Sequence, residues 1–419
     1  MSSNKDNNSD NTTNTDTIIG ILLMIKNEAK SIAVTLNSTK NYFKHIIVYD
    51  TGSTDNTIQI VKETCKKNNQ LLHLKQGLFK GFPESRNESL EFAESVSVNK
   101  LILMDAGDEF RSKYKPNEFL KIINTFPYTC GIVKQQWLMS NSNGSNLEEH
   151  SDIRFICNHK GIRYDVDYPV HEMIKYDDTT NTATNSTNST NDDANSTTHS
   201  VATITDIFLL YQDRVKYGGS TESRYIKDID LLSKAKPNKR NLFFLAQSYM
   251  SINDFHNGYK YNLLCIDADG RSGESSSDNS IGDNTTSYIR AGYCAMMCHF
   301  SEDKIIDNLL MSIKINTNNT ISPPIDPYIY ILKYYMDNNK PEKALIYIDD
   351  LFKLDIKKQE YNKNLNPYFY DYTRWNLISV ICLMCNQKLD KGYKALNKII
   401  DYGKANDIQN MKMYKNIMT

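Results

Sequence analysis

The first third of the chain alternates between strand patterns and helix patterns, and this alternation limits the fold more than any other feature. Continuous apolar runs with β-branched residues, the pattern of strands covered on both faces, occur at 17–25, 45–49 and 100–104. Segments with apolar residues at helical spacing lie between them. Such repetition predicts a mostly parallel α/β sheet with right-handed crossovers.

Two of these expected strands lead directly into aspartates. Asp50 follows HIIVY, and Asp105 follows KLILM. A carboxylate that is buried without a partner costs free energy, and ligands on parallel sheets gather at the carboxyl ends of the strands. We therefore expect both aspartates to face a ligand.

The second of these aspartates begins an acidic run, Asp-Ala-Gly-Asp-Glu, that ends at Glu109. Clustered carboxylates repel one another unless a cation lies between them. Oxygen ligands at a strand end suit Mg²⁺ or Mn²⁺ holding a diphosphate. An acidic helix N-terminus would explain Glu109, but it explains Asp105 poorly.

A basic residue is expected in the first turn of the helix predicted at about 84–98. Arg86 would lie there, where the helix dipole disfavours a cation. A phosphate or carboxylate partner would offset this disadvantage. The guanidinium fork suits diphosphate oxygens, so Arg86 is a candidate donor-binding residue.

From about residue 225 the chain carries helix patterns alone. Three segments, beginning at Asn253, Asn339 and Gln387, resemble one another, and each follows an amphipathic helix. Each segment has a small residue at the same offset: Gly258, Ala344 and Gly392. Helix pairs with a small residue at a tight crossing are typical of tetratricopeptide repeats, so we expect an all-α, TPR-like helical-repeat domain.

Three low-complexity segments, at 1–16, 177–200 and 269–286, interrupt these patterns. They hold too few apolar residues to offset the entropy of ordering them. We expect a disordered polar tail at 1–16 and an α/β domain at 17–215 that contains the 177–200 insertion. The helical domain is expected at 216–419, with the 269–286 insertion inside it.

The composition disfavours several functional classes. The 49 Lys and Arg residues balance 50 Asp and Glu residues, so no general basic surface favours nucleic acid. No run approaches the ~18 apolar residues of a membrane span, and the first apolar run lacks the basic flank of a signal peptide. Eight cysteines are too few for a disulfide scaffold. We therefore expect a cytoplasmic protein. The excess of Asn, Lys, Ile and Tyr is typical of AT-rich genomes, such as those of protists or large DNA viruses. If the chain is viral, the expected location is the host cytoplasm.

Six blocks in this order resemble the family 2 glycosyltransferases that carry C-terminal tetratricopeptide-like repeats. They are MIKNEA (24–29), IIVYDTGSTDNT (46–57), GFPESRNESLEFA (81–93), LILMDAGDE (101–109), DIRFI (152–156) and YPVHEMI (168–174). The match continues weakly through 236–250. The resemblance implies a GT-A fold, which is a Rossmann-like, mostly parallel α/β domain. It also implies a nucleoside-diphosphate sugar as the donor, most often a UDP-sugar.

The resemblance further implies roles for individual residues. Asp50 would contact the nucleotide base, Arg86 would lie by the nucleotide, and Asp105 would bind the ribose and the metal–diphosphate. Asp108 and His171 would join Asp105 as ligands of Mn²⁺ or Mg²⁺. The acidic motif is one residue longer than the family's usual Asp-Ala-Asp-Glu, and a bulge at its glycine would leave Asp105 and Asp108 as the functional pair.

Family membership also implies inversion, which requires a carboxylate base; Glu172 is the first candidate and Asp152 the second. A structural role for His171 and Glu172 in a semi-buried strand is the alternative. We expect a metal-dependent inverting glycosyltransferase whose helical domain docks an acceptor protein or glycan, or forms a homodimer. The opposing hypotheses are a non-catalytic TPR scaffold derived from a glycosyltransferase and, less favoured, a nucleotidyltransferase.

Overall fold

The computed structural model describes residues 18–141, 144–176, 200–217, 221–271, 284–318, 324–354 and 372–405. The chain divides into two compact units, Met1–Thr221 and Glu222–Thr419. The predicted polar tail at 1–16 lies outside the described residues, as does the 177–200 insertion apart from its last residue. The ends of the predicted 269–286 insertion are helical, because one helix continues to Arg271 and the next begins at Thr285.

Four parallel strands form the first half of the main sheet in the first unit. They are β1 (Ile19–Ile25), β2 (His45–Asp50), β3 (Leu71–Gln76) and β4 (Lys100–Met104). β1 lies between β2 and β4, and β3 pairs with the outer side of β2. β1, β2 and β4 are almost wholly buried, which explains why uninterrupted apolar runs predicted them.

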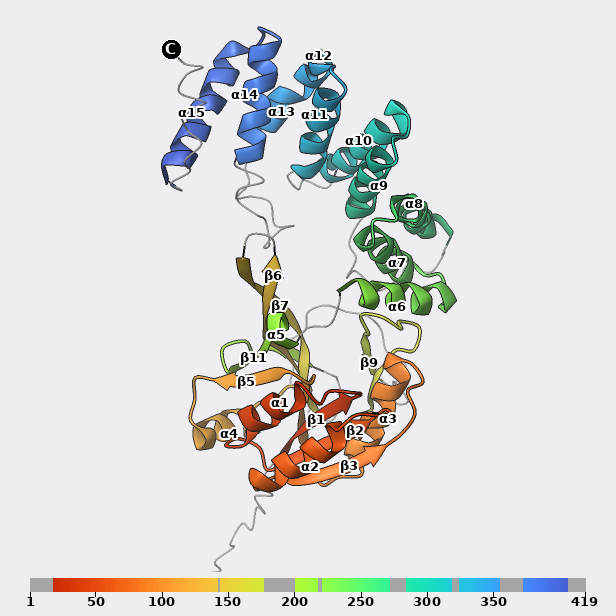
Figure 1. Cartoon of the computed structure of the whole chain (residues 1–419), viewed down its shortest axis with the longest axis vertical. Helices are drawn as coiled ribbons and strands as arrows, with labels where there is room; N and C mark the ends of the chain where they lie inside the picture. Colours follow the sequence, from red (N-terminus) through yellow and green to blue (C-terminus); the bar gives the residue numbers. More distant parts are fainter. Residues whose placement is uncertain are drawn as a thin grey trace, which may run out of the picture. The chain divides into compact units, whose positions relative to one another are not determined.

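Helices cover both faces of this parallel half (Figure 1). Their bounds are α1 (Ile32–Thr39), α2 (Thr57–Lys67), α3 (Phe82–Glu94) and α4 (Pro116–Asn124). Because side chains alternate along a strand, Ile21 and Leu23 pack in one apolar cluster with α1, α2 and α4. Leu22 packs in a second cluster with α3. The sheet is therefore the middle layer of an α/β/α arrangement.

The second half of the sheet is mainly antiparallel. β6 (Cys130–Asn141) and β7 (Gly144–Cys157) form a long hairpin whose second strand pairs with β4. β11 (Phe208–Asp213) pairs in parallel with β6 and antiparallel with β5 (Asp108–Ser112). The order is β3-β2-β1-β4-β7-β6-β11-β5, with β10 (Val201–Thr203) beside β6. A second sheet contains β8 (Ile162–Tyr164) and β9 (Ile174–Tyr176).

The second unit is helical throughout its described residues. After the short α5 (Arg214–Tyr217) of the first unit, its elements are α6 (Thr221–Lys234), α7 (Lys239–Ser251), α8 (Phe255–Arg271), α9 (Thr285–Met297), α10 (Glu302–Asn318), α11 (Asp326–Asp337), α12 (Pro341–Ala344), α13 (Ile348–Lys353), α14 (Arg374–Met384) and α15 (Leu389–Ala405). A 3₁₀ turn, Leu345–Tyr347, joins α12 to α13. The predicted fold class, a Rossmann-like GT-A domain followed by TPR-like helices, is confirmed. None of the described helices is long and apolar enough to cross a membrane.

The helices of this unit form pairs joined by the same turn. A residue with left-handed φ follows α7, α9, α11 and α14 in turn: Asn253, His299, Asn339 and Asn386. At each turn the next amide donates to a carbonyl five residues earlier, as in Asp254 to Tyr249 and Phe300 to Ala295. This is the Schellman arrangement, which ends a helix sharply. The sequence predicted three of these pairs, and α9–α10 is the fourth that it did not identify.

The small residues predicted at the crossings are in close contact with neighbouring helices. A Cβ atom on Gly258 would lie 2.8 Å from Met250 Cγ and 3.0 Å from Cys294 Sγ. One on Gly392 would lie 2.9 Å from Cys382 Cβ. Cys294 and Cys382 are fully buried, so each has a packing role at its crossing.

Candidate active site

Two of the sequence blocks interlock where β1 and β2 end. The Asn27 side chain accepts a hydrogen bond from the Thr54 amide at 2.8 Å, and the Asn27 amide donates to Ser53 Oγ at 2.9 Å. The Glu28 amide donates to Thr57 Oγ1 at 2.7 Å. These bonds hold the loop after β1 against the loop after β2. Many of the residues in these two blocks therefore serve to hold the loops together. The joined loops in turn hold Asp50 in place.

Asp50 is the last residue of β2 and is fully buried. Its carboxylate accepts hydrogen bonds from the Ser53 amide at 3.2 Å, from the Ser53 hydroxyl, and from Gln76 Nε2 at 3.1 Å. Gly52, with φ of 98°, lets the chain turn back over the carboxylate. The hydrogen-bond partners that the buried Asp50 carboxylate needs are thus supplied by the protein itself. The predicted contact of Asp50 with a nucleotide base stays a prediction.

The acidic motif folds into a tight turn from Asp105 to Asp108. The Asp108 amide donates to the Asp105 carbonyl at 3.1 Å, and the Asp105 amide donates to Asp108 Oδ2 at 2.8 Å. Gly107 has φ of 96°, which the third residue of a type II turn requires and glycine adopts freely. The extra residue is therefore absorbed by a turn rather than by the expected bulge, and the two aspartates remain together.

Arg86 is the fifth residue of α3, which begins at Phe82, so it lies in the second helical turn rather than the predicted first. Its Nε donates to Glu172 Oε1 at 2.9 Å, and its Nη2 donates to Asp105 Oδ1 at 3.5 Å. The Arg86 guanidinium carbon lies 5.5 Å from the centroid of the Tyr164 ring. The anionic partners expected for this cation are two carboxylates of the site itself.

A second arginine, Arg154 on β7, binds the same aspartate and was missed by sequence reasoning. Its Nη1 donates to Asp105 Oδ2 at 2.9 Å. Only 12% of the Arg154 side chain is exposed, compared with 39% of the Asp105 side chain. Arg154 lies within the DIRFI block, where a cation between the apolar residues of a buried strand was the available signal.

The charges around the turn shift the pKa values of its two aspartates in opposite directions. Burial alone would raise the pKa of Asp105, but the guanidinium groups of Arg154 and Arg86 outweigh it and hold that pKa well below its usual range. Burial, and then the charge of Asp105, raises the pKa of Asp108 to about 7. Asp108 is only 2% exposed, so its side chain is buried in the turn and does not lie at the surface.

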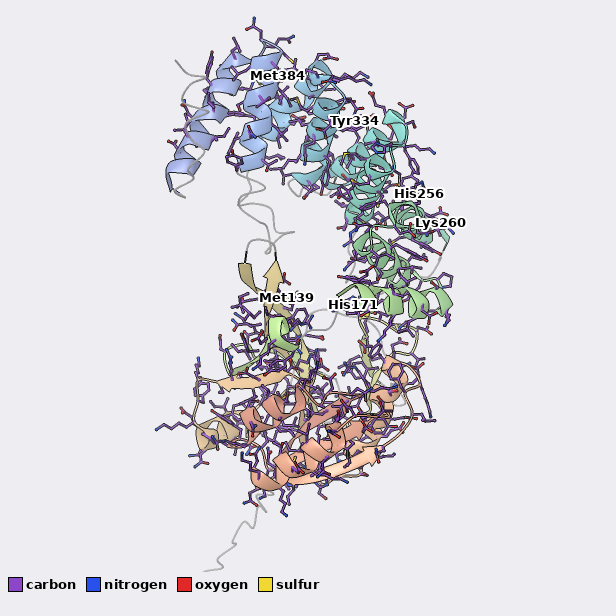
Figure 2. All side chains as sticks on the ribbon, viewed as in Figure 1. Met139, His171, His256, Lys260, Tyr334 and Met384 are labelled. Atoms are coloured by element: carbon purple, nitrogen blue, oxygen red, sulfur yellow. The ribbon has the colours of Figure 1, made fainter. Side chains whose placement is uncertain are left out.

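The remaining predicted residues lie at different distances from this network. Glu172 is half-buried and joins it directly through Arg86. Asp152 has a 61% exposed side chain, and its Oδ2 lies 3.9 Å from Arg154 Nε. His171 is exposed, has φ of 54° and lies before β9 rather than in the predicted semi-buried strand (Figure 2).

The turn has the chemistry that a divalent cation prefers. Asp105 and Asp108 offer carboxylate oxygens, and Asp108 Oδ1 has no hydrogen bond within the described part of the chain. In that same part, no three His, Cys, Asp or Glu side chains form a metal-binding group, so His171 does not complete a set with the two aspartates. Two carboxylates fit an ion that substrate phosphates also hold. The metal itself, and His171 as a ligand, stay predictions.

The strand order, the carboxylates at the strand ends and the paired guanidinium groups are typical of an α/β domain whose ligand site lies at the carboxyl ends of its parallel strands. Residues 21–183, within the first unit, match the model of glycosyl transferase family 2. A curated relative from Rickettsia felis, described as an uncharacterized glycosyltransferase, is 36% identical over 100 residues. The alignment covers 24% of this chain and about a third, 32%, of that relative.

Solved structures similar to this chain include those of TarS and MamA. TarS from S. aureus, residues 1–349, is 13% identical with a TM-score of 0.36, over 73% of this chain and 93% of that chain. The same TarS fragment has been solved in complex with UDP. MamA is 17% identical with a TM-score of 0.33, over 45% of this chain and 88% of that chain.

Proposed function

We propose that this protein transfers a sugar, with inversion, from a nucleoside-diphosphate sugar to an acceptor, with Mn²⁺ or Mg²⁺ as cofactor. The observation that carries the proposal is the position of Asp105, which lies between the guanidinium groups of Arg86 and Arg154 and beside Asp108. Carboxylates suit a metal and guanidinium groups suit a diphosphate, so one place offers ligands for both. A UDP-sugar is the favoured donor.

The residues of the network have complementary roles in this proposal. Asp105 and Asp108 hold the metal, which would neutralise the charge of the leaving nucleoside diphosphate. Arg86 binds the diphosphate in an orientation set by Glu172. Glu172 Oε1 accepts a hydrogen bond from Arg86 Nε at 2.9 Å. Asp50, at the end of β2, contacts the base of the nucleotide.

The two predicted bases differ in their contacts, and the contacts favour Asp152. A base must have a lone pair directed at the acceptor proton. Glu172 is engaged with Arg86, whereas Asp152 is mostly exposed: its Oδ1 accepts the Ile153 amide at 2.8 Å, and its Oδ2 has only a long contact with Arg154. We therefore assign proton abstraction to Asp152 and orientation of Arg86 to Glu172. His171 is retained as a residue that contacts the diphosphate or the metal.

The assignment of the base is tested by separating binding from turnover. Asp152→Asn should lower kcat and leave the Kd of the donor nearly unchanged, because the residue acts only on the acceptor. Glu172→Gln should weaken donor binding as well, because it frees Arg86. A normal kcat in Asp152→Asn would return the role of base to Glu172.

The activity itself is tested by incubating the full chain with UDP- and GDP-sugars in Mn²⁺ or in EDTA. Nucleoside diphosphate should be released from one or a few donors, and EDTA should stop the release. Asp105→Asn should abolish it. If no sugar nucleotide is hydrolysed and none raises the melting temperature with Mn²⁺, the protein is a non-catalytic scaffold.

The helical unit is assigned to the acceptor, a protein or a glycan, because stacked helix pairs present extended binding surfaces rather than catalytic groups. A second copy of the chain is the other partner proposed for this unit. The cytoplasm is the proposed location of the reaction.

A further inference from the structure

We propose that Arg154 competes with the metal for Asp105, and moves to the diphosphate of the donor when the metal binds. This inference rests on the proposed function and adds a specific residue and an order of events to it. Three features of the structure carry it: a bulge in β7, the occupancy of both Asp105 oxygens, and the different support of the two arginines.

A β-bulge aims Arg154 at the acidic turn. Ile153 lies opposite Ile132 of β6 and Phe155 lies opposite Gly131, so Arg154 has no opposing residue in this ladder. Residues two apart in a regular strand share a face, but Ile153 and Phe155 pack in different apolar clusters on opposite faces of the sheet. The inserted residue therefore turns the strand, and bulges commonly re-aim a side chain beside an active site.

Both carboxylate oxygens of Asp105 are occupied by arginines. Oδ2 accepts from Arg154 Nη1 at 2.9 Å and Oδ1 accepts from Arg86 Nη2 at 3.5 Å. A cation that binds Asp105 must take at least one of these oxygens, so it competes with a guanidinium group. The two arginines supply the positive charge that this carboxylate needs.

The two arginines differ in how firmly they are held. Arg86 has a second carboxylate partner, Glu172, at 2.9 Å, and the Tyr164 ring lies against it. Arg154 Nε is buried without a hydrogen bond, and the second ion pair of Arg154, with Asp152, is long at 3.9 Å. The geometry makes Arg154 the guanidinium that a metal displaces.

The displaced guanidinium would stay near the acidic turn and donate hydrogen bonds to the diphosphate of the donor. A guanidinium binds phosphate oxygens in a forked geometry, which would also satisfy the unpaired Nε. Metal and donor then favour each other's binding, because the metal releases the group that the diphosphate uses. Such coupling is reciprocal between the two ligands.

The test measures Mn²⁺ and UDP binding to the full chain by titration calorimetry, with no dependence on turnover. Arg154→Gln should bind Mn²⁺ alone more tightly than the wild type, because the competing cation is gone. It should bind UDP in saturating Mn²⁺ about tenfold more weakly, as expected for the loss of charge-assisted hydrogen bonds. Uridine binding should not change.

Two further variants separate position from charge. Arg154→Lys keeps the charge without the fork, so its UDP affinity should lie between those of the wild type and Arg154→Gln. Arg163→Gln removes a guanidinium that is paired with Glu94 at 2.8 Å and should change neither affinity. Circular dichroism verifies that each variant is folded.

The result that overturns the proposal is an Arg154→Gln protein that binds Mn²⁺ alone no more tightly than the wild type. An unchanged UDP affinity in that variant would equally overturn it. If the wild type binds neither Mn²⁺ nor UDP, the proposed function fails first and this inference fails with it. A wild type that binds both, with a variant that behaves like it, rejects the role of Arg154 alone.

Discussion

Asn87 and Tyr164 hold each other through two hydrogen bonds. Asn87 Nδ2 donates to the Tyr164 carbonyl at 2.9 Å, and the Tyr164 amide donates to Asn87 Oδ1 at 2.7 Å. The pair joins α3 to β8, and it sets the Tyr164 ring against Arg86, the neighbour of Asn87 in α3. One asparagine side chain thus fixes a wall of the proposed donor site.

Replacing Asn87 with alanine should lower the free energy of unfolding by about 1–3 kcal/mol, because two backbone groups lose their partners. It should also weaken UDP binding, since the ring against Arg86 is no longer held. Urea denaturation and calorimetry measure the two effects. Asn56→Ala is a matched control: Asn56 is exposed and makes no capping bond with its side chain, so that variant should stay within about 0.5 kcal/mol of the wild type. Equal stability of the two variants would contradict the role of Asn87.

Asp108→Asn should abolish divalent-metal-dependent turnover while it preserves the fold. The side-chain oxygen of asparagine can still accept a hydrogen bond from the Asp105 amide. The variant also removes a negative charge whose burial costs free energy. Metal-dependent UDP binding should fall by more than about 100-fold, because even outer-shell partners of metal sites are worth about 10- to 100-fold. Calorimetry in Mn²⁺ measures the change. Wild-type turnover by this variant would remove Asp108 from the metal site.

The unfolding free energy should depend on pH through His45 and His73. Their rings are stacked, and His45 Nδ1 lies 3.2 Å from His73 Nε2. Burial lowers the pKa of His73, and burial followed by the charges of His73 and Lys44 lowers the pKa of His45, in both cases from an ordinary 6.5. The unfolded chain therefore binds protons that the folded chain excludes.

The sign follows from these lowered pKa values. The stability contributed by the neutral pair is complete above the unfolded value of 6.5, and it is lost as the pH falls from there through the folded pKa values. Urea denaturation between pH 5 and 8 measures the slope. His73→Gln should flatten it, and an equally steep slope in that variant would assign the effect to other groups.

Arg290 on α9 carries a charge that no acidic residue of the described chain balances. Its guanidinium carbon lies 4.3 Å from the Phe243 ring centroid, Nη2 donates to Gln247 at 3.0 Å, and Nη1 is buried without a hydrogen bond. Burial lowers the pKa of Arg290 to about 10. Because desolvation of this charge opposes folding, Arg290→Met should leave stability unchanged or raise it by about 1 kcal/mol.

The contrast for Arg290 is Arg163→Met, since Arg163 is paired with Glu94 through two nitrogens. That variant should be less stable than the wild type by about 1–3 kcal/mol, because a charged partner is left unpaired. Melting temperatures of both variants of the full chain are the measurement. The interpretation of Arg290 is wrong if its variant loses more stability than that of Arg163.

A fragment of residues 1–221 should bind UDP with Mn²⁺ about as tightly as the full chain. Every residue assigned to the donor, from Asp50 to Glu172, lies in this compact unit. The fragment should transfer poorly to the true acceptor, which is assigned to the helices. A soluble fragment without donor affinity would place part of the donor site in the second unit.

The parallel half of the sheet was predictable from sequence because burial on both faces leaves uninterrupted apolar runs, as in Lys100–Met104. The antiparallel half was not assigned, because strands such as β7 carry polar residues such as Glu148 and Glu149. A strand with one solvent-exposed face has fewer apolar residues in a row, so its sequence pattern is harder to recognise over a few residues.

The site was partly predictable for a related reason. Asp105 and Arg86 were expected at element ends, and the structure joins them. Arg154 was missed because its direction depends on a bulge, which is a property of strand pairing and not of local sequence. The fourth helix pair was missed because its turn uses His299 in place of asparagine and its crossing glycine, Gly292, lies in the first helix of the pair.

The turn at Gly107 has a consequence for how the longer acidic motif was inherited. A Cβ atom there would lie 3.3 Å from Gln212 Nε2, and the φ of 96° already strains any residue with a side chain. A lineage that gained the extra residue without glycine would have lost the alignment of its two aspartates. We therefore expect the extra residue and the glycine to occur together. Natural sequences with this longer spacing will keep glycine at the third position of the motif, whereas those with the shorter spacing are free to vary there.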